Sequence, residues 1–390
     1  MDNKKNGIPK LRFPGFTGAW EQRKLGEVVE RFDNLRIPVT SSKREKGITP
    51  YYGANGIQDY VQGYTHDGEF VLVAEDGAND LQNYPVHYVN GKVWVNNHAH
   101  VLQGKNKMVD NLFLVNAIKQ IKIETYLVGG SRAKLNADVM MKLPIKVPTF
   151  NEQQKIGEYF SKFDTLIALH QRKLEHLQEQ KKGLLQKMFP KNGEVVPEVR
   201  FPGFTDAWEQ RKLGDIAVIF DGTHQTPKYT DSGIKFVSVE NIATLETEKY
   251  ISQKAYENEY SNKQAEKGDI LMTRIGNIGT AKIIEKDEPL AYYVTLALLK
   301  PQNIDSNFLV WGISSPEVQR NIWKLTLHIA FPKKINLGEI NQVTINIPSS
   351  SEQKKIGEFF QQLDSLIALH QRKLEHLELM KKGLLQQMFV

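Results

Sequence analysis

No cysteine occurs among the 390 residues, and this absence excludes disulfides, thiolate metal ligands and cysteine nucleophiles. The chain also lacks any apolar run of about 18 residues, so we expect no membrane-spanning helix. Its first ten residues, MDNKKNGIPK, lack the apolar centre of a secretory signal. Together these absences indicate a soluble protein that stays in the cytoplasm.

Sequence motifs of common catalytic sites are missing as well. There is no G-x-x-x-x-G-K-[ST] loop for a nucleoside triphosphate, no G-x-G-x-x-G loop after a strand, no G-x-S-x-G elbow and no H-E-x-x-H. The Asn-Pro-Pro-aromatic signature of adenine amino-methyltransferases is also absent. His98 and His100 share one face of a strand, but no carboxylate partner is evident in the sequence. We therefore expect them to have a structural or DNA-contacting role.

Charge is distributed evenly along the chain, although the formal net charge is +6. Residues 29–150 contain 14 Lys and Arg against 12 Asp and Glu, and residues 217–350 contain 14 against 15. Neither segment is uniformly basic. Binding of nucleic acid would require basic side chains gathered on one face, or phosphate contacts supplied by a partner.

The chain contains two segments that each occur twice. RFPGFTGAWEQRKLGE at 12–27 returns as RFPGFTDAWEQRKLGD at 200–215, with fourteen of sixteen positions identical. A longer segment at 152–189 returns at 352–389, with 28 of 38 positions identical. The offsets are 188 and 200, so the second half contains 12 additional residues before residue 268. This order of short repeat, variable segment and long repeat predicts two similar halves.

The variable segments between the repeats also share a pattern. GEFVLVAEDG (68–77) aligns with GDILMTRIGN (268–277), and each combines a short apolar strand with a polar loop. KLNADVMMKLPIKVP (134–148) aligns with KINLGEINQVTINIP (334–348), and each ends in an alternating strand closed by proline. We expect these segments to share a fold and to differ at the surface.

Each long repeat predicts a helix with an apolar period of 3.5 residues, which is typical of a coiled-coil seam. Thr149 and Glu152 have the spacing of a capping box at the start of the first helix. A helix of this length, about 57 Å at 1.5 Å per residue, needs a partner, and the other long helix is the nearest candidate. The expected seam residues are Ile156, Phe160, Phe163, Ile167, Leu174, Leu177, Ile356, Phe360, Leu363, Ile367, Leu374 and Leu377.

Four polar residues interrupt the seam, namely His170, His370, Lys181 and Lys381. A paired-histidine metal site is conceivable, but no further ligands lie at a useful spacing. Polar seam residues specify the register of paired helices at a cost in stability. We therefore favour a role in register and expect no metal site in this chain.

The two copies of RFPGF…W…KLG(D/E), each followed by a variable region and a long helix beginning EQ-x-KIG, closely resemble specificity subunits of type I restriction-modification systems. The resemblance covers nearly the whole chain. It implies an α/β (α+β) fold with two similar globular target recognition domains separated by two long antiparallel coiled-coil helices, related by an internal pseudo-twofold repeat. It further implies that each variable domain reads one half of an asymmetric bipartite DNA target, while the helices set the spacer and dock methyltransferase subunits.

The resemblance also implies the partners and the domain limits. Double-stranded DNA, two methyltransferase subunits and, through the complex, restriction/translocase subunits are the expected partners, with no membrane. The chain itself would have no catalytic activity and no cofactor; S-adenosylmethionine, ATP and Mg²⁺ would act in partner subunits during adenine methylation and restriction. The expected segments are a first target recognition domain at 1–150, a long helix at 151–189, a linker at 190–198, a second target recognition domain at 199–350 and a long helix at 351–390.

Polar loops that could enter a DNA groove supply the candidate reading residues, because Arg and Lys suit guanine while Asn and Gln suit adenine. Glycine- and asparagine-rich loops are often plain turns, and exposed lysines are often only solvated. Arg274 and Lys134 are favoured because they begin equivalent parts of the aligned halves. The candidates are Asn55, Asn79, Asn97, His98, Arg132, Lys134, His224, Gln225, Arg274, Asn277, Lys333 and Lys334.

An alternative function is a coiled-coil interaction scaffold that does not read DNA sequence. Its variable domains would bind proteins or RNA, and the 12-residue difference would have no role in recognition. A DNA footprint with two protected patches and an unread spacer would favour the specificity subunit over the scaffold.

Overall fold

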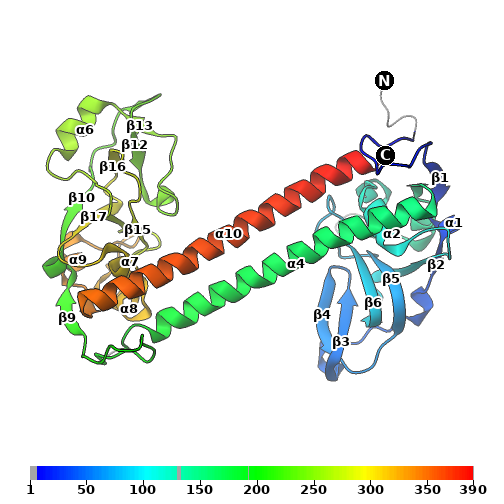
Figure 1. Cartoon of the computed structure of the whole chain (residues 1–390), viewed down its shortest axis with the longest axis horizontal. Helices are drawn as coiled ribbons and strands as arrows, with labels where there is room; N and C mark the ends of the chain where they lie inside the picture. The colour runs from blue at the N-terminus through cyan, green and yellow to red at the C-terminus, as the bar shows by residue number, and fades with distance from the viewer. Residues whose placement is uncertain (1–6, 130–132, 192, 390) are drawn as a thin grey trace. The chain divides into compact units, whose positions relative to one another are not determined.

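The computed structural model describes residues 7–129, 133–191 and 193–389, and the chain divides into two compact units (Figure 1). Unit 1 comprises Met1–Gln171 and Arg372–Val390, and unit 2 comprises Arg172–Gln371. Each unit therefore contains one variable region, the first part of the long helix that follows it, and the last part of the other long helix.

Unit 1 is built on a six-stranded sheet with the order β2-β7-β5-β6-β3-β4. Central strand β5 pairs antiparallel with both β6 and β7, and its segment Phe70–Ala74 is buried throughout. A continuous apolar run is what a strand covered on both faces requires. The strands are β2 (Val29–Arg31), β3 (Lys46–Gly53), β4 (Gly56–Val61), β5 (His66–Ala74), β6 (Val86–Val95) and β7 (Ala99–Gly104).

The remaining elements of unit 1 join this sheet to the long helix. Strand β1 (Glu21–Lys24) of the short repeat pairs antiparallel with β8 (Pro144–Val147), which directly precedes the long helix. The short helices are α1 (Leu25–Val28), α2 (Asn111–Lys119) and α3 (Ala137–Met140), with single 3₁₀ turns at Asp33–Leu35, Ser41–Lys43 and Ile123–Tyr126.

Unit 2 contains two four-stranded sheets, with orders β10-β17-β14-β15 and β11-β13-β12-β16, and a pair formed by β9 and β18. Its strands are β9 (Glu209–Lys212), β10 (Ala217–Asp221), β11 (Tyr229–Thr230), β12 (Ile234–Val237), β13 (Tyr250–Ile251), β14 (Ile270–Thr273), β15 (Ala281–Ile283), β16 (Leu290–Tyr292), β17 (Leu296–Pro301) and β18 (Thr344–Ile347). Its helices are α5 (Leu213–Ile216), α6 (Gln253–Tyr260), α7 (Ser306–Ser314), α8 (Pro316–Leu325) and α9 (Leu337–Gln342), with a 3₁₀ turn at Val239–Asn241.

The two units follow the same plan. Strand β14 lies between β17 and β15, as β5 lies between β7 and β6, and β9 pairs with β18 as β1 pairs with β8. Helix α6 falls within the part of unit 2 that contains the 12 additional residues, and between β4 and β5 unit 1 has no helix. The predicted α/β (α+β) class with an internal repeat is confirmed.

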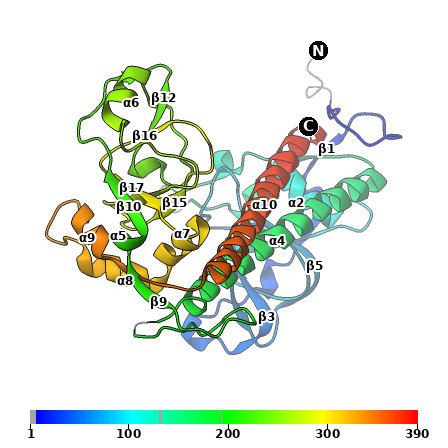
Figure 2. The same cartoon turned by 60° about the vertical axis from the view of Figure 1, so that its left-hand side comes forward.

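The long helices are α4 (Phe150–Lys187) and α10 (Ser350–Met388). In unit 1 the first part of α4 lies beside the last part of α10 in both views (Figure 1, Figure 2). Phe160 approaches Phe389 with ring centroids 6.1 Å apart, and Asp164, further along α4, accepts a hydrogen bond from Lys381, which is earlier in α10. The two segments are therefore antiparallel.

Unit 2 contains the matching arrangement of the other helix halves. Phe189, just after α4, lies 6.2 Å from Phe360 between ring centroids, and Lys181 lies 2.6 Å from Asp364. Lys181 and Lys381 thus have carboxylate partners on the opposite helix, which accounts physically for two polar positions in the seam. The twelve expected seam residues are all buried or partly buried.

The residues that end each long repeat complete the core of the unit that they reach. Phe389 packs in unit 1 against Trp20 and Phe113, with ring centroids 5.6 and 5.4 Å away. Phe189 packs in unit 2 against Trp208 and Phe308 at 5.9 and 5.7 Å. Each tryptophan belongs to a short repeat, so the two kinds of repeat meet in space.

A buried ion pair is the second point where the repeats meet. Arg12 donates from Nε and Nη2 to the two carboxylate oxygens of Glu152, both at 2.7 Å, and Arg200 does the same to Glu352. The capping-box spacing predicts that Glu152 turns back to the first N–H groups of the helix. Its oxygens instead bind an arginine from a distant segment, because the paired guanidinium satisfies a fully buried carboxylate.

Within the part of the chain that the structure describes, every helix is too short or too polar to cross a membrane.

Candidate nucleic-acid interface

Two of the candidate loops of unit 1 are joined by an asparagine side chain. Asn55, in the turn between β3 and β4, donates from Nδ2 to the carbonyl oxygen of Gly77 at 2.9 Å. Its Oδ1 accepts from the backbone N–H of Asn79, also at 2.9 Å. Both asparagine residues are exposed. The loop after β5 and the turn between β3 and β4 therefore form one polar surface.

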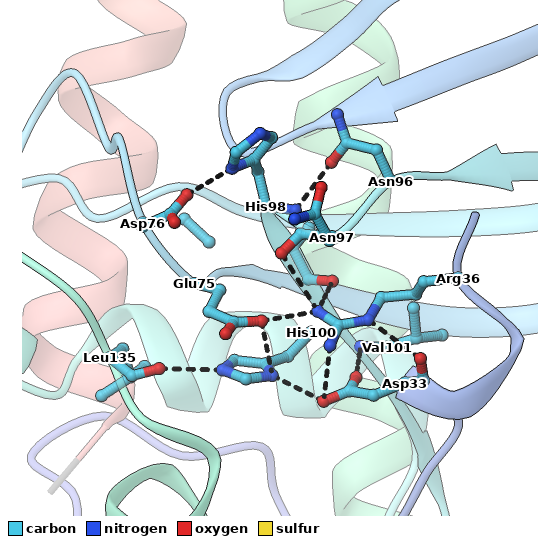
Figure 3. Close-up of polar contacts among 12 residues, drawn as sticks. Asp33, Arg36, Glu75, Asp76, Asn96, Asn97, His98, His100, Val101 and Leu135 are labelled. Carbon is cyan, nitrogen blue, oxygen red and sulfur yellow. Dashed lines mark hydrogen bonds and ion pairs between the residues drawn. The ribbon is translucent and has the colours of Figure 1, made fainter. Parts of the chain in front are cut away.

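The turn between β6 and β7 adds Asn97 and His98, which are both exposed. The ring nitrogen Nδ1 of His98 lies 2.5 Å from Asp76 Oδ1, and the backbone N–H of His98 donates to Asn96 Oδ1 at 2.8 Å (Figure 3). No carboxylate partner for His98 is evident from the sequence, but the structure places one beside it. Asp76 comes from the neighbouring loop, which the sheet brings alongside the turn.

A polar network lies below these exposed residues, as Figure 3 shows. The buried ring of His100 contacts Asp33 Oδ2 through Nδ1 at 2.7 Å and donates from Nε2 to the carbonyl oxygen of Leu135 at 2.8 Å. Arg36 donates from Nη1 to Glu75 Oε2 at 2.6 Å. The network ties the end of β2, the end of β5 and the segment before α3 together, so it positions the loops above it.

Ionised carboxylates hold this network together. Burial alone would raise the pKa of Asp33, but hydrogen bonds from His100 and from the backbone N–H of Val101 hold that pKa below its usual 3.8. Burial also opposes ionisation of Glu75, yet hydrogen bonds, the first of them from Lys134, hold its pKa below the usual 4.5.

Acid is expected to destabilise unit 1 below about pH 4.5, the ordinary pKa of Glu75. Because Asp33 and Glu75 have lowered pKa values in the folded protein, their stabilising effect is complete above the unfolded-state pKa and is lost as the pH falls through the folded-state pKa. Amide hydrogen exchange in unit 1 at stepwise pH measures this loss. Glu75→Gln should flatten the pH dependence, and an unchanged slope in that variant would contradict the assignment.

Lys134 lies at the edge of the network. Its Nζ is 2.8 Å from Glu75 Oε1 while the side chain stays 44% exposed, and the hydrogen bond to Glu75 raises the pKa of Lys134. Its backbone makes antiparallel bridges with Asp76 and Val128. The lysine is therefore held in place and still reaches solvent. Arg132 lies outside the described residues.

In unit 2 the side chain of Arg274 is turned into the protein. It is 12% exposed, pairs with Asp221 at the end of β10, and donates to the carbonyl oxygens of Ile335 and Val294, each at 3.2 Å. Asp221 also lies 2.7 Å from Nε2 of the exposed His224. The side chain of Arg274 therefore connects three segments of unit 2, while His224 lies at the surface.

The other candidates of unit 2 are exposed, namely Gln225, Asn277, Lys333 and Lys334. Lys334 makes antiparallel bridges with Ile275 and Leu327, so its loop borders the loop after β14. Asn277 is held in that loop through its carbonyl oxygen, which accepts from the Thr280 hydroxyl at 3.0 Å.

Four residues of these polar networks are not among the candidates from the sequence, namely Asp33, Arg36, Glu75 and Asp221. A signal was available, because Asp33 and Asp221 are 188 residues apart, the offset of the short repeat, and so are Arg36 and His224. Glu75 and Arg274 occupy equivalent positions. The carbonyl oxygen of Glu75 accepts from the backbone N–H of the residue after Lys134 at 2.7 Å, and that of Arg274 accepts from the residue after Lys334 at 3.0 Å. The two units therefore keep one frame and differ in charge at matching positions.

Among residues 7–129, 133–191 and 193–389 there is no group of three or more His, Asp or Glu side chains that could hold a metal ion.

The family of the chain follows from comparison with known proteins. A family model described as the type I restriction modification DNA specificity domain matches the chain twice, at residues 18–179 and 205–379. These matches cover well over half of the chain and repeat once per half. The chain belongs to the type I restriction-modification DNA specificity family.

Individual relatives agree over nearly the full length. A Haemophilus influenzae protein provisionally named a type I restriction enzyme specificity subunit is 30% identical over 379 residues, covering 94% of this chain and 92% of that protein. The type I restriction enzyme MjaVIII specificity subunit of Methanocaldococcus jannaschii is 22% identical, covering 94% and 91%. The crystal structure of a type I restriction-modification S subunit from M. genitalium has a TM-score of 0.69 at 15% identity, covers 98% of this chain and 99% of that one, and shows the shared fold.

Proposed function

We propose that this chain is the DNA sequence-specificity subunit of a type I restriction-modification complex, without catalytic activity of its own. Each variable region reads one half of an asymmetric bipartite target. The observation that carries the proposal is the repeated frame, whose loops present different exposed polar residues in the two units: Asn55, Asn79, Asn97 and His98 in unit 1, and His224, Gln225, Asn277 and Lys333 in unit 2. A repeated frame presents its loops alike, and different side chains on those loops select different bases.

Exposed leucines on the long helices favour binding of two copies of one partner. Leu166 and Leu169 on α4, in unit 1, are exposed, and so are their equivalents Leu366 and Leu369 on α10, in unit 2; all four are between 38% and 51% exposed. Two identical apolar surfaces fit two identical modification subunits. Those subunits would supply S-adenosylmethionine chemistry for adenine methylation, and restriction/translocase subunits would use ATP and Mg²⁺. The assembly would act in the cytoplasm, with the helices setting the spacer.

Exchange of one variable region is expected to change one half of the target and to leave the other half unchanged. The exchange of residues 217–342 with the matching region of a relative keeps β9, β18 and both long helices native, so the foreign region enters and leaves at the same strands. Base contacts lie on loops, which change without altering the core. Sequencing of methylated sites made by the assembled complex gives the answer.

The matched control is an exchange of residues 29–142, which keeps β1 and β8 native and should change only the other half of the target. A chimera that alters both halves, or neither, would contradict partition of recognition between the units. Failure of the unaltered complex to methylate any specific sequence would favour the scaffold function.

A further inference from the structure

The loop between α8 and α9 of unit 2 has an apolar tip that nothing in unit 2 covers. Ile329 is 99% exposed and Phe331 is 104% exposed, the highest values among the large hydrophobic side chains of the described residues. Water disfavours such a surface, and contiguous exposed apolar groups generally mark a contact with another molecule. We call residues 327–334 the apolar loop.

The base of the apolar loop is firmly held. The backbone N–H of Leu327 donates to the carbonyl oxygen of Lys334 at 2.8 Å, and Lys334 also bridges to Ile275 after β14. The next residue, Ile335, donates its N–H to the carbonyl oxygen of Arg274 at 3.0 Å. The tip is therefore presented from the same strand end that holds the candidate reading residues of unit 2.

An aromatic side chain supports the flanks of the tip. His328 donates from Nε2 to the carbonyl oxygen of Trp323 at 2.9 Å, and the two ring centroids are 4.2 Å apart. On the other side of the tip, Lys333 places its Nζ 4.7 Å from the centroid of the same indole. The loop is thus a built projection with both flanks resting on one tryptophan of α8.

The charged residues close to the tip in sequence have one sign. Residues 323–336 contain three lysines and one histidine, and no aspartate or glutamate. An apolar tip between basic flanks suits a polyanion that has apolar layers between its charges, which describes stacked base pairs between phosphates. The position beside the candidate reading loops favours DNA over an anionic membrane surface.

We propose that the tip of the apolar loop inserts Phe331, with Ile329 beside it, as a wedge at one base-pair step within or next to the half-site of unit 2. The proposal rests on the proposed function and extends it to distortion of the DNA. Insertion of an apolar side chain partly unstacks a step and kinks the duplex, and Lys333 and Lys334 neutralise the phosphates on either side. Sequences with easily unstacked steps are then selected without a direct base contact.

The wedge belongs to one half of the molecule. The equivalent segment of unit 1, residues 128–134, reads VGGSRAK, and after Val128 it has no apolar side chain larger than alanine. Residues 130–132 of that segment lie outside the described residues. Distortion is therefore expected at one half-site only.

The test uses the full chain assembled with its modification subunits, after the target has been mapped by sequencing of methylated sites. A set of DNA duplexes carries 2-aminopurine at successive positions of one half-site, namely the half-site that changes when residues 217–342 are exchanged. The unaltered complex should raise the fluorescence severalfold at one step, and Phe331→Ala should abolish that rise and weaken binding by about tenfold, the scale of one lost base–aromatic stack. Phe331→Trp should restore both.

The control is Ile48→Ala in unit 1, which removes a side chain that is 94% exposed and lies at the far end of β3 from Asn55. It should leave the fluorescence and affinity unchanged. A bipartite methylation pattern without a fluorescence rise in the unaltered complex would overturn the wedge alone. So would a Phe331→Ala variant that keeps full DNA affinity and instead loses binding to anionic vesicles or to the modification subunits. Absence of any sequence-specific methylation would overturn the proposed function together with the wedge.

Discussion

Replacement of Phe389 by alanine is expected to lower the free energy of unfolding of unit 1 by about 3–5 kcal/mol, the usual range for loss of a buried phenylalanine. Phe389 is 5% exposed, and its ring is surrounded by those of Trp20, Phe113 and Phe160. Removal of the ring leaves a cavity among aromatic groups that come from three distant segments of the chain. Such groups are anchored separately and collapse poorly into the space.

The matched variant is Phe189→Ala, which removes the equivalent ring in unit 2 between Trp208 and Phe308. Amide hydrogen exchange measured across the whole chain separates the two effects, because each variant should raise exchange in its own unit. If Phe389→Ala accelerates exchange mainly in unit 2, or leaves the protection of unit 1 unchanged, the packing described for the end of α10 is wrong.

Replacement of Arg200 by alanine is expected to destabilise unit 2 by about 3–5 kcal/mol, since it leaves a buried carboxylate without its partner. Glu352 is 1% exposed at the side chain and accepts both of its short hydrogen bonds from Arg200. The hydrogen bond to Glu352 also raises the pKa of Arg200, so the guanidinium stays charged. The cost comes mainly from the charge that is left behind.

A double variant separates the effect of the unpaired charge on Glu352 from the effect of lost packing around Arg200. In the double variant Arg200→Ala with Glu352→Gln the buried charge is gone, so a substantial part of the stability should return. Arg12→Ala is the matched change in unit 1, where the pair has the same geometry. Chemical denaturation, followed by amide hydrogen exchange in each unit, measures the change in stability of both variants. A change of less than about 0.5 kcal/mol for Arg200→Ala would place the pair among ion pairs that contribute little.

The residues replaced in these two predictions all belong to the repeated segments. The short repeat supplies an arginine and a tryptophan, and the long repeat supplies a glutamate at its start and a phenylalanine at its end. In each unit the arginine pairs with the glutamate and the tryptophan packs against the phenylalanine, which comes from the end of the other long repeat. A variable region can therefore change its loops while the contacts that frame it stay the same.

Features that depend on neighbouring residues and on internal comparison could be predicted from the amino-acid sequence alone. The period of 3.5 residues predicted the two long helices and their buried faces, and the paired repeats predicted two similar units. Apolar strands closed by proline located β8 and β18. These signals are local, so they survive without knowledge of the fold.

The contacts between residues that are distant in sequence could not be predicted in this way, because they depend on the three-dimensional fold. Local spacing assigns Glu152 to a helix cap, but a buried carboxylate is better satisfied by the guanidinium of Arg12, 140 residues away. The same reason explains Arg274, which the sequence presents as a base reader and which the fold surrounds with Asp221 and two carbonyl oxygens. Likewise, the partners of His98 and His100 come from other strands and loops of the unit. Hydrogen-bond partners are chosen by proximity in space after the chain has folded, and a one-dimensional pattern does not contain that proximity.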